Sequence, residues 1–244
     1  MTTLKQIQGS HVLVTGANRG IGKALVEALL ERGATKVYAS SRDLANLAPF
    51  ANDNDRVVPV ELDVTDADSI AAAVSRIPQL DLLINNAGTA TGMSYTAPES
   101  LAVAQNEMAT HYFGTLLLSK ALLAPLKQSA NAGIINISSI AGIANFKQLG
   151  PYSASKAAVH FLTQGLRAEL EADDISVLGV YPGPVDTRLA PSPDIPKSST
   201  RDVAQAILDA YEEGQEDAYP DPFSQNIIAL FAKDRKAVEK AFAA

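Results

Sequence analysis

The chain has 244 residues, of which 47% are hydrophobic and 19% charged, and its formal net charge is −7. This apolar fraction excludes intrinsic disorder, and the absence of cysteine excludes a disulfide framework, a zinc–thiolate site and a cysteine nucleophile. The acidic balance without a basic cluster argues against nucleic acid or an anionic membrane as a partner. With only three histidines, widely spaced, no metal site is predicted.

The amino terminus, Met1–Ser10, lacks the apolar centre of a signal peptide. No apolar run approaches the ~18 residues that span a membrane. We therefore expect a cytoplasmic protein.

Short β-branched segments alternate with longer helical ones along the chain. The expected strands are His11–Thr15, Lys36–Ser40, Val57–Leu62, Leu80–Asn85, Gly133–Ser138 and Ile175–Tyr181. The expected helices span about 21–29, 66–77, 98–128, 152–172 and 227–243. Strands that are apolar throughout are buried on both faces, which is typical of a parallel sheet. The pattern predicts an α/β fold, a single-domain, Rossmann-like, doubly wound parallel sheet with helices on both faces.

One composition shift interrupts this alternation. Five prolines fall within Pro182–Thr200, a segment long enough for a functional loop. We expect residues from about 188 to 214 to form a substrate lid and a helix within one domain of residues 1–244.

The first strand leads into a glycine-rich segment, Thr15–Gly22, and then directly into a helix. Glycines at 16, 20 and 22 let the backbone turn sharply and approach a pyrophosphate closely, and the helix amino end offers free N–H groups. The spacing G-x-x-x-G-x-G differs from the common G-x-G-x-x-G. The alternative is a tight turn with incidental glycines, but the strand–turn–helix context favours cofactor binding.

Further motifs follow the later strands. They are Asp63, Asn85-Asn86-Ala87-Gly88, Ser139, Tyr152-x-x-x-Lys156 and Pro182-Gly183-Pro184-Val185-Asp186-Thr187. With the glycine loop, they resemble the short-chain dehydrogenase/reductase family, in its short single-domain branch, over nearly the whole chain from about residue 11.

The resemblance implies a nicotinamide cofactor. The residues implied to bind it are Gly16, Asn18, Arg19, Gly20, Ile21, Gly22, Ser41, Arg42, Asp63, Val64, Asn86, Ala87, Gly88, Tyr152, Lys156, Pro182, Gly183, Val185 and Thr187. Asp63 resembles the adenine-contacting acid of the family, with a helix N-cap as the alternative, although Thr65 and Asp66 are better placed to cap.

The end of the second strand discriminates between the two nicotinamide cofactors. An acid there accepts hydrogen bonds from the adenosine ribose of NAD, whereas an Arg accommodates the phosphate of NADP. Here Ser41 and Arg42 follow the strand, and Arg19 lies in the glycine loop. We favour NADP(H) over NAD(H). The alternative is that Arg42 stacks on the adenine and Asp43 repels the phosphate.

Tyr152 and Lys156 are spaced i, i+4 and so share one helix face. A phenol with a pKa of ~10 is a poor acid–base catalyst at neutral pH, and a nearby ammonium lowers that pKa. The resemblance implies that Lys156 also holds the nicotinamide ribose and that Ser139 fixes the substrate oxygen. Ser138 is the rival for the serine role, and the thirteen-residue spacing to Tyr152 favours Ser139.

One position departs from the family pattern. His111 stands where the family usually has an Asn whose backbone helps hold a water linking the Lys to solvent. Either the helix backbone holds this water whatever the side chain, or His111 joins the relay as a catalytic group, since histidine titrates near neutrality.

These residues predict an oxidoreductase, a short-chain alcohol dehydrogenase or carbonyl reductase, that interconverts a ketone or aldehyde and an alcohol with Tyr152 as general acid and base. The alternative is an NADP-binding sensor without turnover.

The candidate pocket segments, 89–95 and 140–150, are mostly apolar or small, which suggests a small hydrophobic substrate. The long helices at 98–128 and 152–172 are apolar around most of their circumference, which indicates a protein partner. The resemblance implies that these helices pair in a homodimer or homotetramer.

Overall fold

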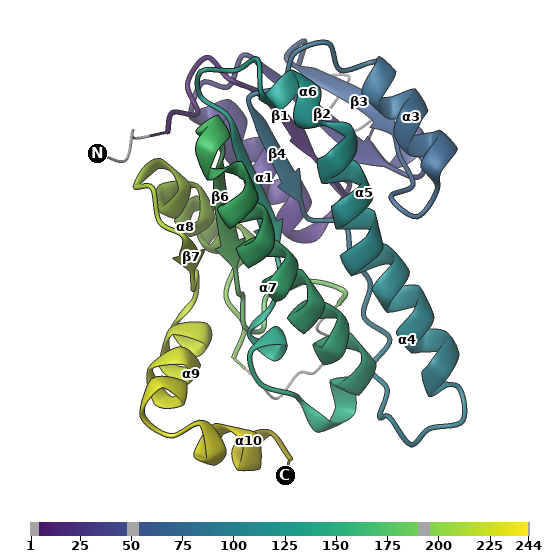
Figure 1. The fold of residues 1–244 in the computed structure, drawn as a ribbon, viewed down its shortest axis with the longest axis vertical. Helices are drawn as coiled ribbons and strands as arrows, with labels where there is room; N and C mark the ends of the chain where they lie inside the picture. The colour runs from purple at the N-terminus through teal and green to yellow at the C-terminus, as the bar shows by residue number, and fades with distance from the viewer. Residues whose placement is uncertain (1–4, 48–53, 190–195, 244) are drawn as a thin grey trace.

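A computed structural model describes residues 5–47, 54–189 and 196–243. Seven parallel strands form one sheet in the order β3-β2-β1-β4-β5-β6-β7 (Figure 1). The strands are β1 (His11–Val14), β2 (Lys36–Ser41), β3 (Val57–Glu61), β4 (Leu82–Asn85), β5 (Gly133–Ile137), β6 (Ser176–Val180) and β7 (Asp217–Ala218). The six expected strands are confirmed. The sequence analysis missed β7 because two residues carry no recognisable pattern.

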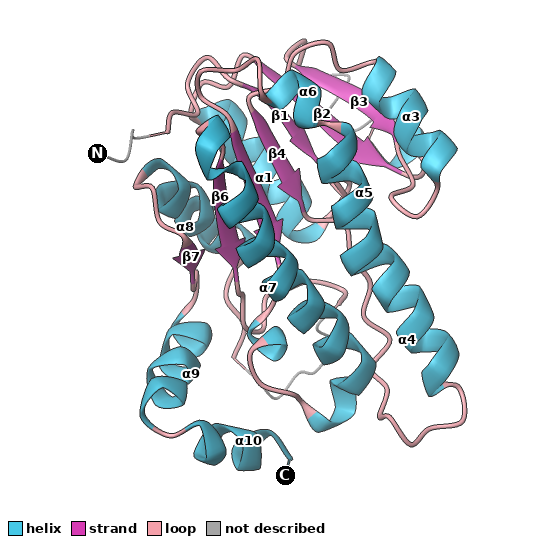
Figure 2. Cartoon of the chain, in the orientation of Figure 1, coloured by secondary structure: helices cyan, strands magenta, loops and turns pink. Residues whose placement is uncertain are grey.

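Helices cover both faces of the sheet (Figure 2). They are α1 (Gly20–Glu31), α3 (Ala67–Ser75), α4 (Ser100–Met108), α5 (Gly114–Ala121), α6 (Leu123–Leu126), α7 (Gly150–Leu170), α8 (Thr200–Glu212), α9 (Pro222–Lys233) and α10 (Arg235–Ala243). Along β1, Val12 and Val14 join a core with α1 and α8, whereas Leu13 joins a second core with α3, α5 and α7. This alternation makes the sheet doubly wound, as predicted.

The long helix expected over 98–128 is interrupted twice. A π-helical turn, Ala109–Phe113, separates α4 from α5, and the helix ends at Ala121 before the short α6. Pro125 explains the second break, because its ring would clash with the carbonyl of the residue four positions earlier in a continuous helix. The π turn contains His111 and lies beside the site described below.

The tail expected as one helix over 227–243 is two helices. Asp234 is extended between α9 and α10, and its carboxylate accepts a hydrogen bond from the backbone N–H of Ala237 at 3.0 Å, which caps α10. The ring of Phe242 stacks on that of Phe146, with centroids 3.8 Å apart, so the carboxyl-terminal helix packs onto the segment after β5.

Of the expected lid, residues 190–195 lie outside the described residues. The flanking parts are joined by a bridge between Val185 and Ser198, and the expected helix is α8.

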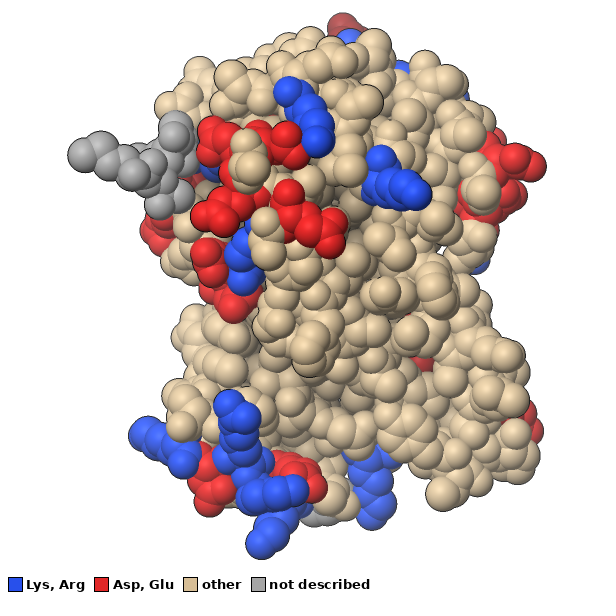
Figure 3. All heavy atoms as spheres, viewed as in Figure 1, with Lys and Arg blue, Asp and Glu red and all other residues tan. Residues whose placement is uncertain are grey.

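None of the described helices combines the length and the apolar character needed to cross a bilayer. Figure 3 shows few charged side chains over the middle of the face formed by α7, α4 and α5, whereas basic side chains gather over α9 and α10.

Candidate active site

The loop after β1 is shaped for close approach by a ligand. Gly16 and Gly20 have φ angles of 62° and 56°, in the left-handed region that favours glycine. A Cβ on Gly22 would collide with the carbonyl oxygen of Gly16. No side chain caps the amino end of α1. Its first N–H groups are therefore available to an anion.

The end of β4 holds this loop in place. The Thr15 hydroxyl oxygen accepts hydrogen bonds from the backbone N–H groups of Asn86 and Ala87, each at 2.9 Å. In turn, Nδ2 of Asn86 donates to the carbonyl oxygens of Thr15 and Gly16, at 2.8 and 3.2 Å. The Asn86–Gly88 motif thus fixes the glycine loop as well as lining the space beside it.

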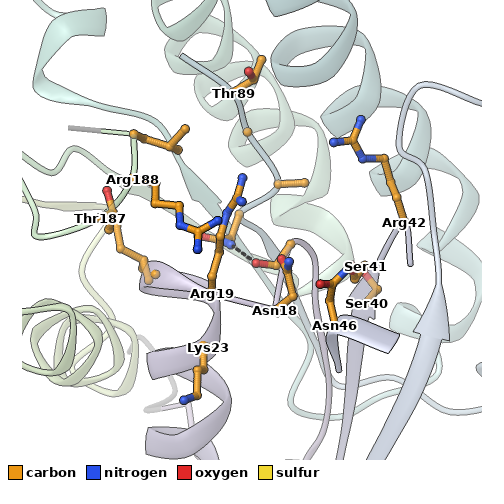
Figure 4. Close-up of a pocket in the computed structure, with 18 of the residues that line it drawn as sticks. Asn18, Arg19, Lys23, Ser40, Ser41, Arg42, Asn46, Thr89, Thr187 and Arg188 are labelled. Carbon is orange, nitrogen blue, oxygen red and sulfur yellow. Dashed lines mark hydrogen bonds between the residues drawn. The ribbon is translucent and has the colours of Figure 1, made fainter. Parts of the chain in front are cut away.

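The loop borders a cleft of about 1050 Å³. Of the predicted cofactor-binding residues, those lining it are Gly16, Asn18, Arg19, Gly20, Ile21, Gly22, Ser41, Arg42, Asp63, Val64, Asn86, Ala87, Gly88 and Thr187. Figure 4 shows Arg19 and Arg188 projecting into the same part of the cleft, while Arg42 enters it from the end of β2. Among the described residues, none of these three guanidiniums forms an ion pair with a carboxylate.

The carboxylates near Arg42 accept hydrogen bonds from residues two or three positions further along the chain. The carboxylate of Asp43 accepts hydrogen bonds from the backbone of Ala45 and the side chain of Asn46, both at 2.9 Å. Asp63 accepts from the N–H and hydroxyl of Thr65 at 2.9 and 2.7 Å. Burial alone would raise the pKa of Asp63, but these hydrogen bonds and the charge of Arg42 bring it below the usual value. Asp66 caps α3, as the sequence indicated.

The segment after β6 is tied to the carboxyl-terminal helices. The backbone N–H of Gly183 donates to Asp221 Oδ2 at 2.7 Å, and Asp221 is also the N-cap of α9. The carbonyl oxygen of Pro182 accepts from the backbone of Ile140 at 3.0 Å. Pro182 therefore lies next to the segment after β5, and Pro182, Gly183 and Val185 are not among the residues that line the cleft.

Ser139, Tyr152 and Lys156 come together where β5 meets the start of α7. The Ser139 hydroxyl donates to the carbonyl oxygen of Pro182 at 3.4 Å, accepts from the backbone N–H of Ala141 at 3.1 Å, and lies near enough to Tyr152 to lower the pKa of the phenol. Lys156 Nζ lies 5.7 Å from the centre of the tyrosine ring. Lys156 Nζ donates to the carbonyl oxygen of Ile137 at 2.8 Å. Ser138 instead donates to the carbonyl oxygen of Lys156, at 2.9 Å. The two serines thus have different partners, and of the two only Ser139 affects the pKa of the phenol.

Burial governs the protonation of this cluster. It raises the pKa of Tyr152 to about 12, an effect that the charge of Glu107 increases and the hydrogen bond with Ser139 reduces. Burial lowers the pKa of Lys156 to about 8, and Glu107 opposes that change. In the protein alone burial raises the pKa of the phenol, so the lowering expected from the ammonium is not seen. Tyr152 is consequently a protonated donor at neutral pH.

Comparison with known proteins shows the family to which the chain belongs. The model of the family described as short chain dehydrogenase matches residues 10–194. The chain belongs to the short-chain dehydrogenase family. A dehydrogenase of this family from Burkholderia cenocepacia, solved in complex with NADP, is 40% identical and has a TM-score of 0.90, over 98% of this chain and 99% of that one.

Two other proteins that resemble this chain support its assignment to the short-chain dehydrogenases. The NADPH-bound carbonyl reductase from chicken fatty liver is 31% identical with a TM-score of 0.80, over 87% of this chain and 96% of that one. An uncharacterized oxidoreductase of Staphylococcus saprophyticus is 34% identical over 221 residues, which cover 85% of this chain and 93% of the relative. The chain is accordingly an oxidoreductase.

His111 is the departure from the short-chain dehydrogenase pattern, and its side chain is fully engaged. Its Nε2 accepts a hydrogen bond from the backbone N–H of Thr89 at 3.0 Å, so the ring proton lies on Nδ1, 2.8 Å from Ser155 Oγ. Ser155 then donates to the carbonyl oxygen of Tyr152 at 2.7 Å. Burial and the charge of Lys156 lower the pKa of His111 well below its usual value. The structure therefore favours a neutral histidine that braces α7.

The sequence analysis missed three residues near the site. Glu107, buried four residues before His111, could have been suspected because an acid stands in a helix close to a candidate catalytic position. Arg188 was assigned only to the lid, although it lines the cleft. Asp221 had no distinguishing pattern, because its partner, Gly183, is 38 residues away.

Proposed function

We propose that the chain is an NADP(H)-dependent carbonyl reductase, or alcohol dehydrogenase in the reverse direction, with Tyr152 as its general acid and base. The observation that carries this proposal is the convergence of Ser139, Tyr152 and Lys156 at the carboxyl edge of the sheet. That edge also carries the glycine loop, and ligands of open α/β sheets bind there.

The residues present fit a dinucleotide cofactor. The glycine loop leaves no room for side chains where a pyrophosphate would approach, and the uncapped amino end of α1 favours an anion. The guanidiniums of Arg19 and Arg42, free of carboxylates among the described residues, suit a ribose phosphate, since Arg binds phosphate through several N–H donors at once. Ser41, where an acid would favour NAD, supports NADP(H).

A nicotinamide held beside these residues would supply the hydride that the carbonyl carbon takes up. The chain's own residues handle the oxygen. Ser139 holds the carbonyl oxygen beside the phenol, and Tyr152 donates its proton to that oxygen, which completes the alcohol. Lys156, fixed by the carbonyl of Ile137, keeps a positive charge next to the phenolate that forms.

We expect a hydrophobic substrate and a homo-oligomer. The relative from chicken fatty liver is named a carbonyl reductase. Large apolar side chains are exposed on the helices that form the face in Figure 3: Leu101, Phe113, Leu117 and Phe161 are 70%, 51%, 43% and 71% exposed. Exposed apolar helix faces commonly mark a contact with another protein. Sedimentation that shows only monomer would contradict the oligomer.

The direct test is to incubate the purified protein with NADPH or NADH and a panel of ketones and aldehydes. We expect oxidation of NADPH, faster than that of NADH, with apolar carbonyl compounds. Binding of NADPH without oxidation by any carbonyl would contradict the enzyme and favour a nucleotide-sensing protein.

A further inference from the structure

A buried carboxylate lies next to the proposed proton donor and has no assigned role. Glu107, in the last turn of α4, is 1% exposed. Its Oε1 accepts a hydrogen bond from the backbone N–H of Thr91 at 3.0 Å. Its Oε2 is also buried and has no hydrogen-bond partner among the described residues. A buried acceptor without a donor is costly, so a water or a proton is expected at this oxygen.

The charged and titratable groups that face Glu107 come from two elements. Helix α4 packs against α7, and the charge of Glu107 acts on both Lys156 and Tyr152. The π turn that continues α4 carries His111 and Tyr112, and both ring nitrogens of His111, the buried one of the two, are already hydrogen-bonded. Lys156 is therefore the natural partner of the free carboxylate oxygen.

Lys156 has donors to spare. An ammonium carries three N–H groups, and only one of them is used within the described chain, on the carbonyl oxygen of Ile137. Glu107 and Lys156 form no ion pair within 4.0 Å, although both are described. A water bound between them would satisfy the free oxygen and a free N–H together.

The helix that carries this carboxylate borders the cofactor cleft. Asn106, next to Glu107, and Thr110, three residues further on, both line that cleft. Burial raises the pKa of Glu107, whereas its hydrogen bonds with Thr91 and the charge of Lys156 lower it, and burial prevails. A carboxyl group of this kind exchanges protons closer to neutrality than an exposed one does.

We propose that Glu107 is the positioning residue for the proton supply of this site, acting as the buried counter-ion of Lys156 and returning protons from the cleft to Tyr152 through Lys156. This proposal rests on the proposed function. In each reduction Tyr152 loses its proton to the carbonyl oxygen, and the phenolate regains one from the Lys156 ammonium. The Lys156 amine is reprotonated through the bridging water by the Glu107 carboxyl, which takes its proton from solvent, so one solvent proton is consumed per alcohol formed.

The test is Glu107→Gln, which keeps the shape and the Thr91 contact but removes the ionisable group. We expect the first turnover, measured by rapid mixing with NADPH and a carbonyl, to be unchanged because Tyr152 starts protonated. Steady-state turnover should fall about 10-fold, less than the ~100-fold or more that a positioned general acid contributes, because Glu107 acts only through Lys156. The matched control is Glu99→Gln, an exposed residue before the same helix, which should behave as wild type.

The pH profile separates this role from a merely structural one. Without the carboxylate, the pKa of Lys156 should fall below about 8, so the loss of reduction rate at high pH should begin at a lower pH than in wild type. Steady-state rates and pH profiles equal to those of wild type would overturn the proposal, as would an equal loss in the first turnover.

A readout that needs no turnover distinguishes failure of this proposal from failure of the proposed function. In protein carrying ¹³C-labelled lysine, with Lys156→Met used to assign the resonance, the Lys156 pKa should be lower in Glu107→Gln than in wild type. If wild type reduces no carbonyl but the pKa falls, the proposed function fails and the counter-ion role stands. If the pKa does not change, Glu107 is not the counter-ion and the proposal is overturned.

Discussion

At one end of the site, Arg19, Arg42 and Arg188 are exposed and project into open space. At the other end Lys156 and Glu107 are enclosed by protein, at 5% and 1% exposure. Water screens exposed charges, so each guanidinium acts on a ligand nearly independently of the others. Desolvation shifts the pKa of buried groups and makes each group depend on its neighbours.

The difference predicts how mutations should behave. Changes at the exposed end should alter cofactor affinity by graded amounts and leave the chemical step intact. Changes at Tyr152 and Glu107, at the buried end, should alter the chemical step or its pH dependence and leave cofactor affinity intact. Each prediction below tests whether cofactor affinity and the chemical step can be altered separately.

The largest effect is expected for Tyr152→Phe, which removes the phenolic proton and keeps the ring. We expect reductase turnover to fall about 1,000-fold, within the range ascribed to a positioned general acid. NADPH affinity, measured by fluorescence titration, should remain that of wild type. Substantial residual turnover would refute Tyr152 as the acid, and lost affinity would show that the two ends are not separable.

In contrast to Tyr152→Phe, Gly22→Ala should weaken cofactor binding and leave the chemical step intact. The added Cβ would collide with the carbonyl oxygen of Gly16, and overpacking of this kind costs ~1–3 kcal/mol. We expect the dissociation constant for NADPH to rise about 10-fold, which corresponds to ~1.4 kcal/mol. The rate at saturating cofactor should be largely kept.

Gly165→Ala is the matched control for that variant. A Cβ at Gly165, within α7, meets nothing within 4 Å. Alanine there should stabilise the helix by ~0.5–1 kcal/mol, seen as a higher melting temperature, with unchanged NADPH binding. Equal NADPH binding by Gly22→Ala and wild type would contradict the proposed phosphate loop.

Arg42→Ala tests the cofactor preference. Loss of one charge-assisted hydrogen bond to a phosphate should raise KM for NADPH about 10-fold, and KM for NADH should not change. Lys23→Ala is the control, since Lys23 also lines the cleft but pairs with Glu27 at 3.6 Å. A parallel rise for both cofactors would mean that Arg42 contacts the adenine rather than a phosphate.

The sequence was most informative where function depends on local backbone geometry. The glycine loop follows a strand and opens a helix, and Tyr152 and Lys156 share a helix face by spacing alone, so neither needs long-range information. The strands were found because burial on both faces makes them apolar throughout.

What the sequence could not supply were contacts between distant segments. Asp221 is paired with Gly183, and Glu107 comes to lie near Lys156 only because α4 packs on α7. The raised pKa of Tyr152 escaped prediction for the same reason, since burial is a property of the fold and not of the i, i+4 spacing. The break at Asp234 was missed because an acid in an amphipathic pattern resembles an ordinary exposed residue until it caps the next helix.

The smallest effect is expected for His111→Asn, and it decides which buried group supplies protons. The histidine has no free N–H, and its pKa lies well below the usual value, so it stays neutral over the working pH range. We expect an unchanged pH–rate profile. The melting temperature should fall by about 2–4 °C if the shorter side chain leaves the N–H of Thr89 unpaired, at a cost of ~1 kcal/mol.

His111→Gln, whose longer side chain can still accept from Thr89, is the companion variant and should recover part of that stability. If the high-pH limb of the reduction profile moves in His111→Asn and not in Glu107→Gln, the histidine belongs to the proton route and Glu107 does not. If it moves only in Glu107→Gln, the two residues on adjacent turns have divided roles, one bracing α7 and the other maintaining the charge of Lys156.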